Sequence, residues 1–176
     1  MNIEQLPALA EDDTTVHMVV EAPRGATVKL KYAPKLQAFT PARALPLGLA
    51  YPFDWGFIPG TRAADGDPVD ALTLHDTATY PGVVLPCRCL ALIELDQRTG
   101  DGDSRERNDR LLLLPTWEDR LGDVADFHAL PRRMREEVEQ FFLSTTFFTA
   151  KEARILGWRD ADHALAFVRQ HRISPP

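Results

Sequence analysis

The chain has 176 residues and a mass of 19.7 kDa, the size of one domain with a core that is stable without disulfide or metal staples. Apolar residues make up 44% and charged residues 26% of the sequence, which excludes a disordered tail protein, a collagen-like repeat and a coiled coil. With 20 Lys and Arg against 26 Asp and Glu, the formal net charge is -6, which argues against nucleic acid and anionic membranes as partners.

The two cysteines and the first residues bear on cellular location. Cys87 and Cys89 lie two apart in an apolar run, where a strand points both to one face, so we expect buried free thiols. Residues 1–7 lack the basic flank and apolar core of a secretory signal, and no apolar run is long enough to span a bilayer. The expected location is the cytoplasm, with no membrane partner.

Short apolar runs bounded by Pro, Gly and Asp fill the first two thirds of the chain, a pattern typical of an all-β meander or barrel. The predicted strands are residues 16–22, 27–32, 71–74, 83–95 and 110–114. Alternation is clearest in the second run, where apolar residues share one face and Lys29 and Lys31 share the other. Five strands suit a small barrel.

Two helices are predicted after this β region. Residues 131–143 begin with Pro131, which fits the first helical position, and residues 161–170 follow Asp160, a suitable N-cap. Apolar residues recur at helical spacing in both: Met134, Val138, Phe141 and Phe142 in the first, and Ala164, Leu165 and Val168 in the second. The polar stretch 96–109 is expected to be an extended hairpin loop. The predicted fold is mainly β with flanking helices, a five-stranded OB-type barrel plus two α-helices, in one domain over residues 1–176.

The densest group of chemically active residues is an acidic loop just before the third predicted strand. Asp65, Asp67 and Asp70 fall within six residues, and carboxylates held this close repel one another unless a cation lies between them. Gly66 permits a tight turn and Pro68 fixes the backbone, so the three side chains can converge. An all-oxygen set suits Mg²⁺, Ca²⁺ or Mn²⁺ rather than zinc.

Two other interpretations of this loop were weighed. Asp, Gly and Pro are also the residues that any solvated surface turn prefers, and composition alone does not separate that turn from a metal site. A calcium EF-hand loop requires an acceptor at its fifth position and Gly at its sixth, but Val69 and Asp70 stand there. The EF-hand interpretation therefore fails.

The loop from Asp65 to Asp70 matches an Asp-x-Asp-Pro-hydrophobic-Asp signature, and with it the chain resembles the soluble family I inorganic pyrophosphatases. Other landmarks fall at compatible spacing over roughly residues 16–168: Glu21, Lys29, Arg43, Tyr51, Pro52 and Gly56 upstream, and Asp123, Val124, Asp126, Leu130, Phe141, Phe142, Gly157 and Trp158 downstream. The family fold, a five-stranded OB-type barrel with two helices, agrees with the elements predicted above.

This resemblance implies magnesium-dependent hydrolysis of pyrophosphate to two phosphates, with Mn²⁺ as an alternative ion. Asp65 and Asp70 would be metal ligands, Asp70 bridging two ions that share the attacking water, and Asp67 would be the general base. The resemblance gives the other roles as follows: Lys29, Arg43 and Arg110 bind phosphate oxygens, Tyr51 donates from or packs in the pocket wall, and Glu21 holds a further ion. Water between two divalent ions has a lowered pKa, so this chemistry is reasonable near neutral pH.

Three of these residues have ordinary alternative explanations when taken singly. Lys29 lies on a strand whose other face is apolar, so it could be a solvated lysine. Tyr51, next to Pro52, could plug the barrel, and Arg43, in a Pro-rich connection, could pair with a surface acid. Their assignment rests on their joint occurrence.

The chain also departs from the family pattern at its phosphate-binding positions. Lys31 stands where well-known bacterial members have glutamate, on the same face as Lys29, and Trp55 replaces a tyrosine. We expect both at the substrate. Thr145 and Thr146 occupy the place of a tyrosine-lysine pair that binds phosphate. The site should therefore offer fewer side chains that bind phosphate.

Two metal positions depart as well. Gln97 stands where a metal-binding aspartate is expected, and Asp96, one residue earlier, could serve only if a bulge turned it to the site. Asn108 takes the place of a third metal aspartate, and its amide oxygen can ligate an ion but brings no charge. Asp96 and Asn108 are nonetheless expected as ligands.

Three functions follow, of which two are enzymatic and the third is binding without catalysis. The leading one is a magnesium-dependent inorganic diphosphatase. A weakened relative acting on another phosphoanhydride, such as a nucleotide or polyphosphate, is the second, and a non-catalytic OB-type binding module is the third. The resemblance also implies a homo-oligomer, with a hexamer as the expected form.

Overall fold

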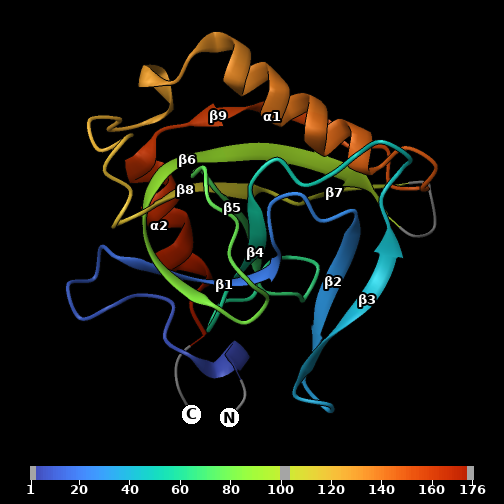
Figure 1. The fold of residues 1–176 in the computed structure, drawn as a ribbon, viewed down its shortest axis with the longest axis horizontal. Coiled ribbons are helices and arrows are strands. Elements are labelled where there is room, and N and C mark those ends of the chain that lie inside the picture. Colours follow the sequence, from blue (N-terminus) through green and yellow to red (C-terminus); the bar gives the residue numbers. More distant parts are fainter. Residues whose placement is uncertain (1–2, 100–103, 174–176) are drawn as a thin grey trace.

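The computed structural model describes residues 3–99 and 104–173, which form a barrel of strands with two helices packed outside it (Figure 1). The strands are β1 (Val16–Ala22), β2 (Val28–Ala33), β3 (Ala38–Ala44), β4 (Asp54–Ile58), β5 (Val69–Thr73), β6 (Val84–Arg98), β7 (Arg105–Arg107), β8 (Arg110–Pro115) and β9 (Arg154–Arg159). The helices are α1 (Arg132–Thr145) and α2 (Ala161–His171), with short 3-10 turns at Ile3–Gln5 and Phe127–Ala129.

Five strands close the barrel in the order β1, β4, β5, β8, β6, because β6 pairs with β8 on one side and with β1 on the other. Only one neighbouring pair of this ring, β5 with β8, is parallel. The long β6, with 15 residues, continues past the ring and pairs there with β7 and β9. The predicted five-stranded barrel with two helices is confirmed.

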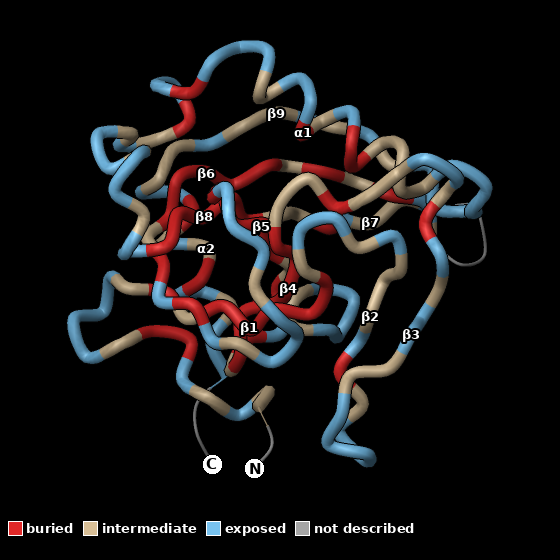
Figure 2. The backbone as a smooth tube through the Cα atoms, viewed as in Figure 1, coloured by how far each residue is buried: buried red, intermediate tan, exposed pale blue. Residues whose placement is uncertain are grey.

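The membership of the barrel differs from the prediction at one strand. The run predicted at 27–32 forms β2, which pairs with β3 in a separate two-stranded sheet beside the barrel. Pro41 lies in β3, and proline, which donates no hydrogen bond, is tolerated in such an edge strand. Figure 2 shows this hairpin as mainly exposed or partly buried next to the buried ring. The β2–β3 hairpin therefore forms a wall over the barrel rather than part of it.

The core extends to both faces of the barrel strands. Along β8, Leu111 and Leu113 pack in the apolar cluster that includes α2, and Leu112 and Leu114 pack in the cluster that includes α1. Both faces are buried, which explains why this strand has a continuous apolar run rather than an alternating one. Cys87 and Cys89 are buried free thiols, as expected.

The sequence prediction lacks four strands, β3, β4, β7 and β9, and of these only β4 belongs to the ring. Gly56 lies in β4, and a Cβ at this position would come within 1.9 Å of the Val19 carbonyl oxygen on β1. Only glycine allows the two backbones this close approach. Glycine lowers the strand propensity of a five-residue run, so local sequence gave no clear signal for β4.

At the two ends of the polar stretch 96–109, expected to be a hairpin loop, β6 runs on to Arg98 and β7 pairs with it, while residues 100–103 lie outside the described residues. Both predicted helices are present, and the Asp160 carboxylate accepts a hydrogen bond from the backbone N–H of His163 at 3.0 Å, as an N-cap should. Within the described ranges, no helix combines the length and apolar character needed to cross a membrane.

Candidate active site

Two hollows lie under the β2–β3 hairpin. The larger, of about 230 Å³, we call the basic pocket. Its charged wall consists of four cations and, among the described residues, no carboxylate: Lys29, Arg43, Arg110 and Lys151. Its apolar wall is mainly aromatic: Tyr51, Trp55, Phe141 and Phe142, with Leu95 and Ala153. This combination suits an anion with several negative charges.

The hairpin and the barrel together position these cations. Lys29 on β2 is the cross-strand partner of Arg43 on β3, and the Arg43 guanidinium donates to the Thr145 carbonyl oxygen at 2.8 Å, at the end of α1. Trp55 on β4 lies beneath two of them, because its ring centre is 5.8 Å from Lys29 Nζ and 5.4 Å from the Arg110 guanidinium. Cation–π attraction therefore holds Lys29 and Arg110 over one indole ring.

The electrostatics of the basic pocket favour bound negative charge. Burial lowers the pKa of Lys29, and the neighbouring Arg110 guanidinium lowers it further, although the Asp70 carboxylate opposes this. Burial also raises the pKa of Tyr51, so its hydroxyl remains a proton donor through the neutral range. An anion in the pocket would relieve the repulsion among the cations.

The smaller hollow, of about 60 Å³, we call the acidic pocket. Its charged lining residues are Glu4, Glu21, Asp67 and Asp70, together with Lys31. The Asp65–Asp70 loop turns at Gly66, which has φ +87°, and the backbone N–H of Asp67 donates to the Asp65 carboxylate at 3.1 Å.

Crowding and burial disfavour charge on the acidic residues. Burial raises the pKa of Glu21 to about 7, and the Asp70 carboxylate adds to the effect, while the Tyr32 backbone N–H, which donates to Glu21 at 3.0 Å, opposes it. Partial burial raises the pKa of Asp65, and the Asp70 and Asp67 carboxylates raise it further. These groups would be stabilised by a nearby cation.

Two side chains of this protein already supply positive charge there. Lys31 Nζ lies 2.7 Å from Asp67 Oδ2, and an Arg110 nitrogen lies 2.7 Å from Asp70 Oδ2. The Arg110 guanidinium also donates to the Asn108 amide oxygen. Since Arg110 lines the basic pocket as well, it joins the two hollows.

Comparison with known proteins identifies the family. The inorganic pyrophosphatase family model matches residues 18–173. The chain belongs to the inorganic pyrophosphatase family. An inorganic pyrophosphatase of Thermus thermophilus is 36% identical over 171 residues, which cover 96% of this chain and 94% of the relative, and one of Synechocystis sp. is 30% identical, covering 97% and 96%. The crystal structure of the Thermus thermophilus inorganic pyrophosphatase superposes with a TM-score of 0.87 at 34% identity, covering 96% of this chain and 95% of that one.

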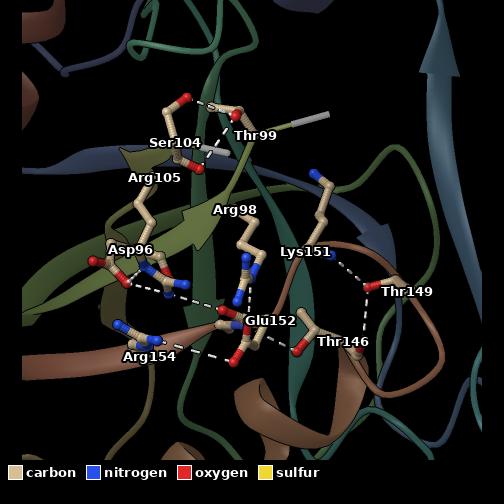
Figure 3. A network of polar contacts seen from close by, with 11 residues as sticks. Asp96, Arg98, Thr99, Ser104, Arg105, Thr146, Thr149, Lys151, Glu152 and Arg154 are labelled. Atoms are coloured by element: carbon tan, nitrogen blue, oxygen red, sulfur yellow. Dashed lines mark hydrogen bonds and ion pairs between the residues drawn. The ribbon is translucent and has the colours of Figure 1, made fainter. Parts of the chain in front are cut away.

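Of the predicted metal ligands, Asp65, Asn108 and Asp96 line neither pocket; Asp65 accepts from the Asp67 backbone N–H and Asn108 from Arg110, whereas Asp96 pairs away from both pockets. The Asp96 carboxylate accepts from Arg105 Nε at 2.8 Å (Figure 3). Gln97, next along β6, is buried, lines the basic pocket and donates to Glu106 at 3.1 Å. The register irregularity of β6 nearest to Asp96 falls between Glu94 and Leu95. The structure thus shows Asp96 paired with Arg105 outside both pockets, and its role as a metal ligand stays a prediction.

Only some of the positions that the pyrophosphatase pattern assigns to metal ligands have side chains here that fit a magnesium ion. The described residues contain no group of three or more His, Cys, Asp or Glu arranged to hold a metal. Magnesium, however, is usually held by one or two carboxylates plus substrate phosphate, and Asp65 and Asp70 can supply those two. Gln97 and Asn108 bring no charge, and Asn108 already accepts from Arg110. Gln97 and Asn108 therefore do not fit an ion in the free protein.

Sequence reasoning missed two charged residues at the pockets, Lys151 and Glu4. Lys151 follows α1 in a turn with no strand or helix pattern, so nothing local predicts its place on the basic pocket. Glu4 reaches the acidic pocket because its carbonyl oxygen accepts from the Gly60 backbone N–H at 2.7 Å, which fixes the N-terminal segment beside the β4–β5 connection. Both depend on contacts between segments distant in sequence.

Proposed function

We propose that this chain is a magnesium-dependent inorganic diphosphatase that hydrolyses pyrophosphate to two phosphates. The observation that carries the proposal is the pair of pockets: among the described residues, four cations and no carboxylate line one, and the Asp67 and Asp70 carboxylates line the other. Arg110, through its contact with Asp70, puts the two within reach of one small substrate. Pyrophosphate is a compact, multiply charged anion of the kind that such a pocket binds.

In this proposal the substrate's phosphates lie in the basic pocket. Lys29, Arg43 and Arg110 donate to phosphate oxygens, and Tyr51, kept protonated by burial, donates from the wall. Trp55 supports Lys29 and Arg110 from below. The positive charge of these residues stabilises the negative charge that develops on the leaving phosphate.

The acidic pocket supplies the attacking group. Asp67 accepts a proton from water, and Lys31, 2.7 Å from one Asp67 oxygen, orients the carboxylate and offsets the charge of Glu21 and Asp70. Asp65 and Asp70 would hold magnesium, with Glu21 near a further ion, and Asn108 offers a neutral oxygen. When bound, magnesium would neutralise phosphate charge and lower the pKa of water. Mn²⁺ would serve as a substitute ion.

A phosphate-release assay tests the proposal. Purified protein is given pyrophosphate, ATP or tripolyphosphate, each with magnesium and with EDTA. The proposal expects release from pyrophosphate with magnesium and not with EDTA. Release from none of the three would contradict it and would favour a binding module without catalysis.

One observation favours a second candidate, hydrolysis of another phosphoanhydride. Thr145 and Thr146 line the basic pocket, but their hydroxyls donate to the carbonyl oxygens of Phe142 at 2.8 Å and Leu143 at 2.9 Å. They bring no charge to grip a terminal phosphate. Faster release from ATP or tripolyphosphate than from pyrophosphate would favour this candidate.

The assembly is an expectation from the resemblance, and the location is one from the cysteines and the first residues of the sequence. Several large apolar side chains are exposed on the single chain, among them Leu47, Phe148 and Leu156, and burial of such residues between copies supports a homo-oligomer, expected to be a hexamer. Sedimentation at micromolar protein tests this, and a monomer would contradict it. We expect the protein in the cytoplasm, which fractionation of its own cells would check.

A further inference from the structure

A polar network holds the segment that follows α1 against the end of β6 (Figure 3). Arg98 on β6 pairs with the Glu152 carboxylate, and Arg105 on β7 donates to the Glu152 carbonyl oxygen at 2.8 Å. Asp96 in turn holds Arg105, and Arg154 lies 3.9 Å from Glu152. Glu152 has φ +38°, an uncommon conformation for a residue with a side chain, and these contacts from both strands stabilise it.

The network fixes the backbone of Lys151 on both sides. The backbone N–H of Arg98 donates to the Lys151 carbonyl oxygen at 2.6 Å, and the Lys151 N–H donates to the Thr149 hydroxyl at 3.3 Å. The side chain of Lys151 lines the basic pocket and extends away from the network in Figure 3. Within the described part of the chain, its ammonium group makes no ion pair. It is thus a positioned cation with no anionic partner.

Lys29, Arg43 and Arg110 line the basic pocket from β2, β3 and β8, whereas Thr145 and Thr146, at the end of α1, are neutral and bonded to the helix backbone. We propose that Lys151 is a substrate-binding residue that donates to phosphate oxygens of the diphosphate, and that Asp96 and Arg105 are positioning residues that hold it there through Glu152. This inference rests on the proposed function. It also gives Asp96 a role that does not require Asp96 to bind a metal.

The test measures binding of methylenediphosphonate, a diphosphate with a non-hydrolysable bridge, by calorimetry in the presence of magnesium. We expect Lys151→Gln to weaken binding roughly tenfold, the usual order for one charged hydrogen bond, and Lys151→Arg to keep binding near that of the unchanged protein. Lys35→Gln is the matched control, since it removes the same charge from an exposed lysine that lines neither pocket. Lys35→Gln should leave affinity unchanged.

A second binding experiment tests whether Asp96 positions Lys151. Asp96→Asn should weaken binding several-fold in the unchanged protein and have almost no effect when Lys151→Gln is already present. Lys151→Gln within twofold of the unchanged protein would overturn the role of Lys151 while leaving the proposed function standing. A full Asp96→Asn effect in the Lys151→Gln background would overturn the positioning role. Absence of any binding by the unchanged protein would instead overturn the proposed function and this inference together.

Discussion

The basic and acidic pockets differ in charge, although one strand serves both. Lys29 and Lys31 both lie on β2, whose register with β3 shifts between Lys29 and Leu30; Lys29 lines the basic pocket, and Lys31 lies 2.7 Å from Asp67 in the acidic one. The basic pocket is built on aromatic rings from β4 and α1, while the acidic one is built on a Gly-Pro loop and β1. The two pockets meet at the ion pair between Arg110, which lines the basic pocket, and Asp70, which lines the acidic one.

Taken together, the positive and negative side chains at the two pockets balance. Five cations (Lys29, Lys31, Arg43, Arg110 and Lys151) line the pockets, and they are matched by four lining carboxylates (Glu4, Glu21, Asp67 and Asp70) and by Asp65, which interacts with Asp67 and Asp70. Because the charges cancel, the free protein should attract divalent cations weakly. Magnesium should arrive mainly as its complex with the substrate. The following predictions test how far the two pockets act separately.

The largest expected effect comes from the acidic pocket. Asp67→Asn removes the proposed proton acceptor and should lower kcat by ~10²- to 10⁴-fold, with little change in KM, because the basic pocket still binds the substrate. Asp70→Ala should be comparably inactive. Steady-state kinetics with pyrophosphate and magnesium measure both. A loss below about tenfold in Asp67→Asn would remove Asp67 from that role.

The contact between the pockets comes next. Arg110→Gln removes a phosphate ligand and leaves Asp70 without its cation, so kcat/KM should fall by roughly 10- to 100-fold, with a raised KM. Arg110→Lys is the matched variant: it keeps the charge but cannot reach Asp70, Asn108 and phosphate at once, and should lose less. Equal losses in the two variants would show that charge at this position is unimportant.

A smaller effect is expected on the magnesium requirement. Lys31→Glu and Asn108→Asp each add negative charge beside the acidic pocket, so each should lower the magnesium concentration for half-maximal rate by a few-fold. Titration of the rate against magnesium compares the two variants with the unchanged protein. An unchanged or higher requirement in both would contradict the charge argument.

The smallest effect concerns stability. The pKa of Glu21 is about 7 in the folded chain against 4.5 for a free side chain, so the unfolded state ionises first and stability is lost as pH rises from about 4.5 to about 7. Glu21→Gln lacks this loss and can still accept from Tyr32. Its Tm should exceed that of the unchanged protein by a few degrees at pH 8 and match it at pH 4.5. Thermal melts at the two pH values measure this, and an equal difference at both would contradict it.

Features that depend on residues close together in the sequence could be predicted, and features that depend on contacts between distant segments could not. The barrel, the helices and the Asp65–Asp70 loop depend on local patterns, and these were readable. β4 was not, because Gly56 is required by the approach of β1 rather than by its neighbours in sequence.

At the pockets, the face of a strand was predictable but its exact register was not. Strand alternation correctly places Gln97 and Asp96 on opposite faces of β6. Only the structure shows that Asp96 pairs with Arg105, which contacts the segment after α1. Lys151 could not be foreseen, since its position depends on Arg98 and Glu152, which are 54 residues apart. Residues fixed by such contacts need the whole fold.

The central claim is that the basic pocket binds the diphosphate through the protein's own cations. Calorimetric titration with methylenediphosphonate in EDTA tests it most directly, with Arg43→Gln and Asp65→Asn as a matched pair. The account predicts measurable binding without magnesium, weakened roughly tenfold by Arg43→Gln and scarcely changed by Asp65→Asn. No binding in EDTA, or the same loss in both variants, would contradict it.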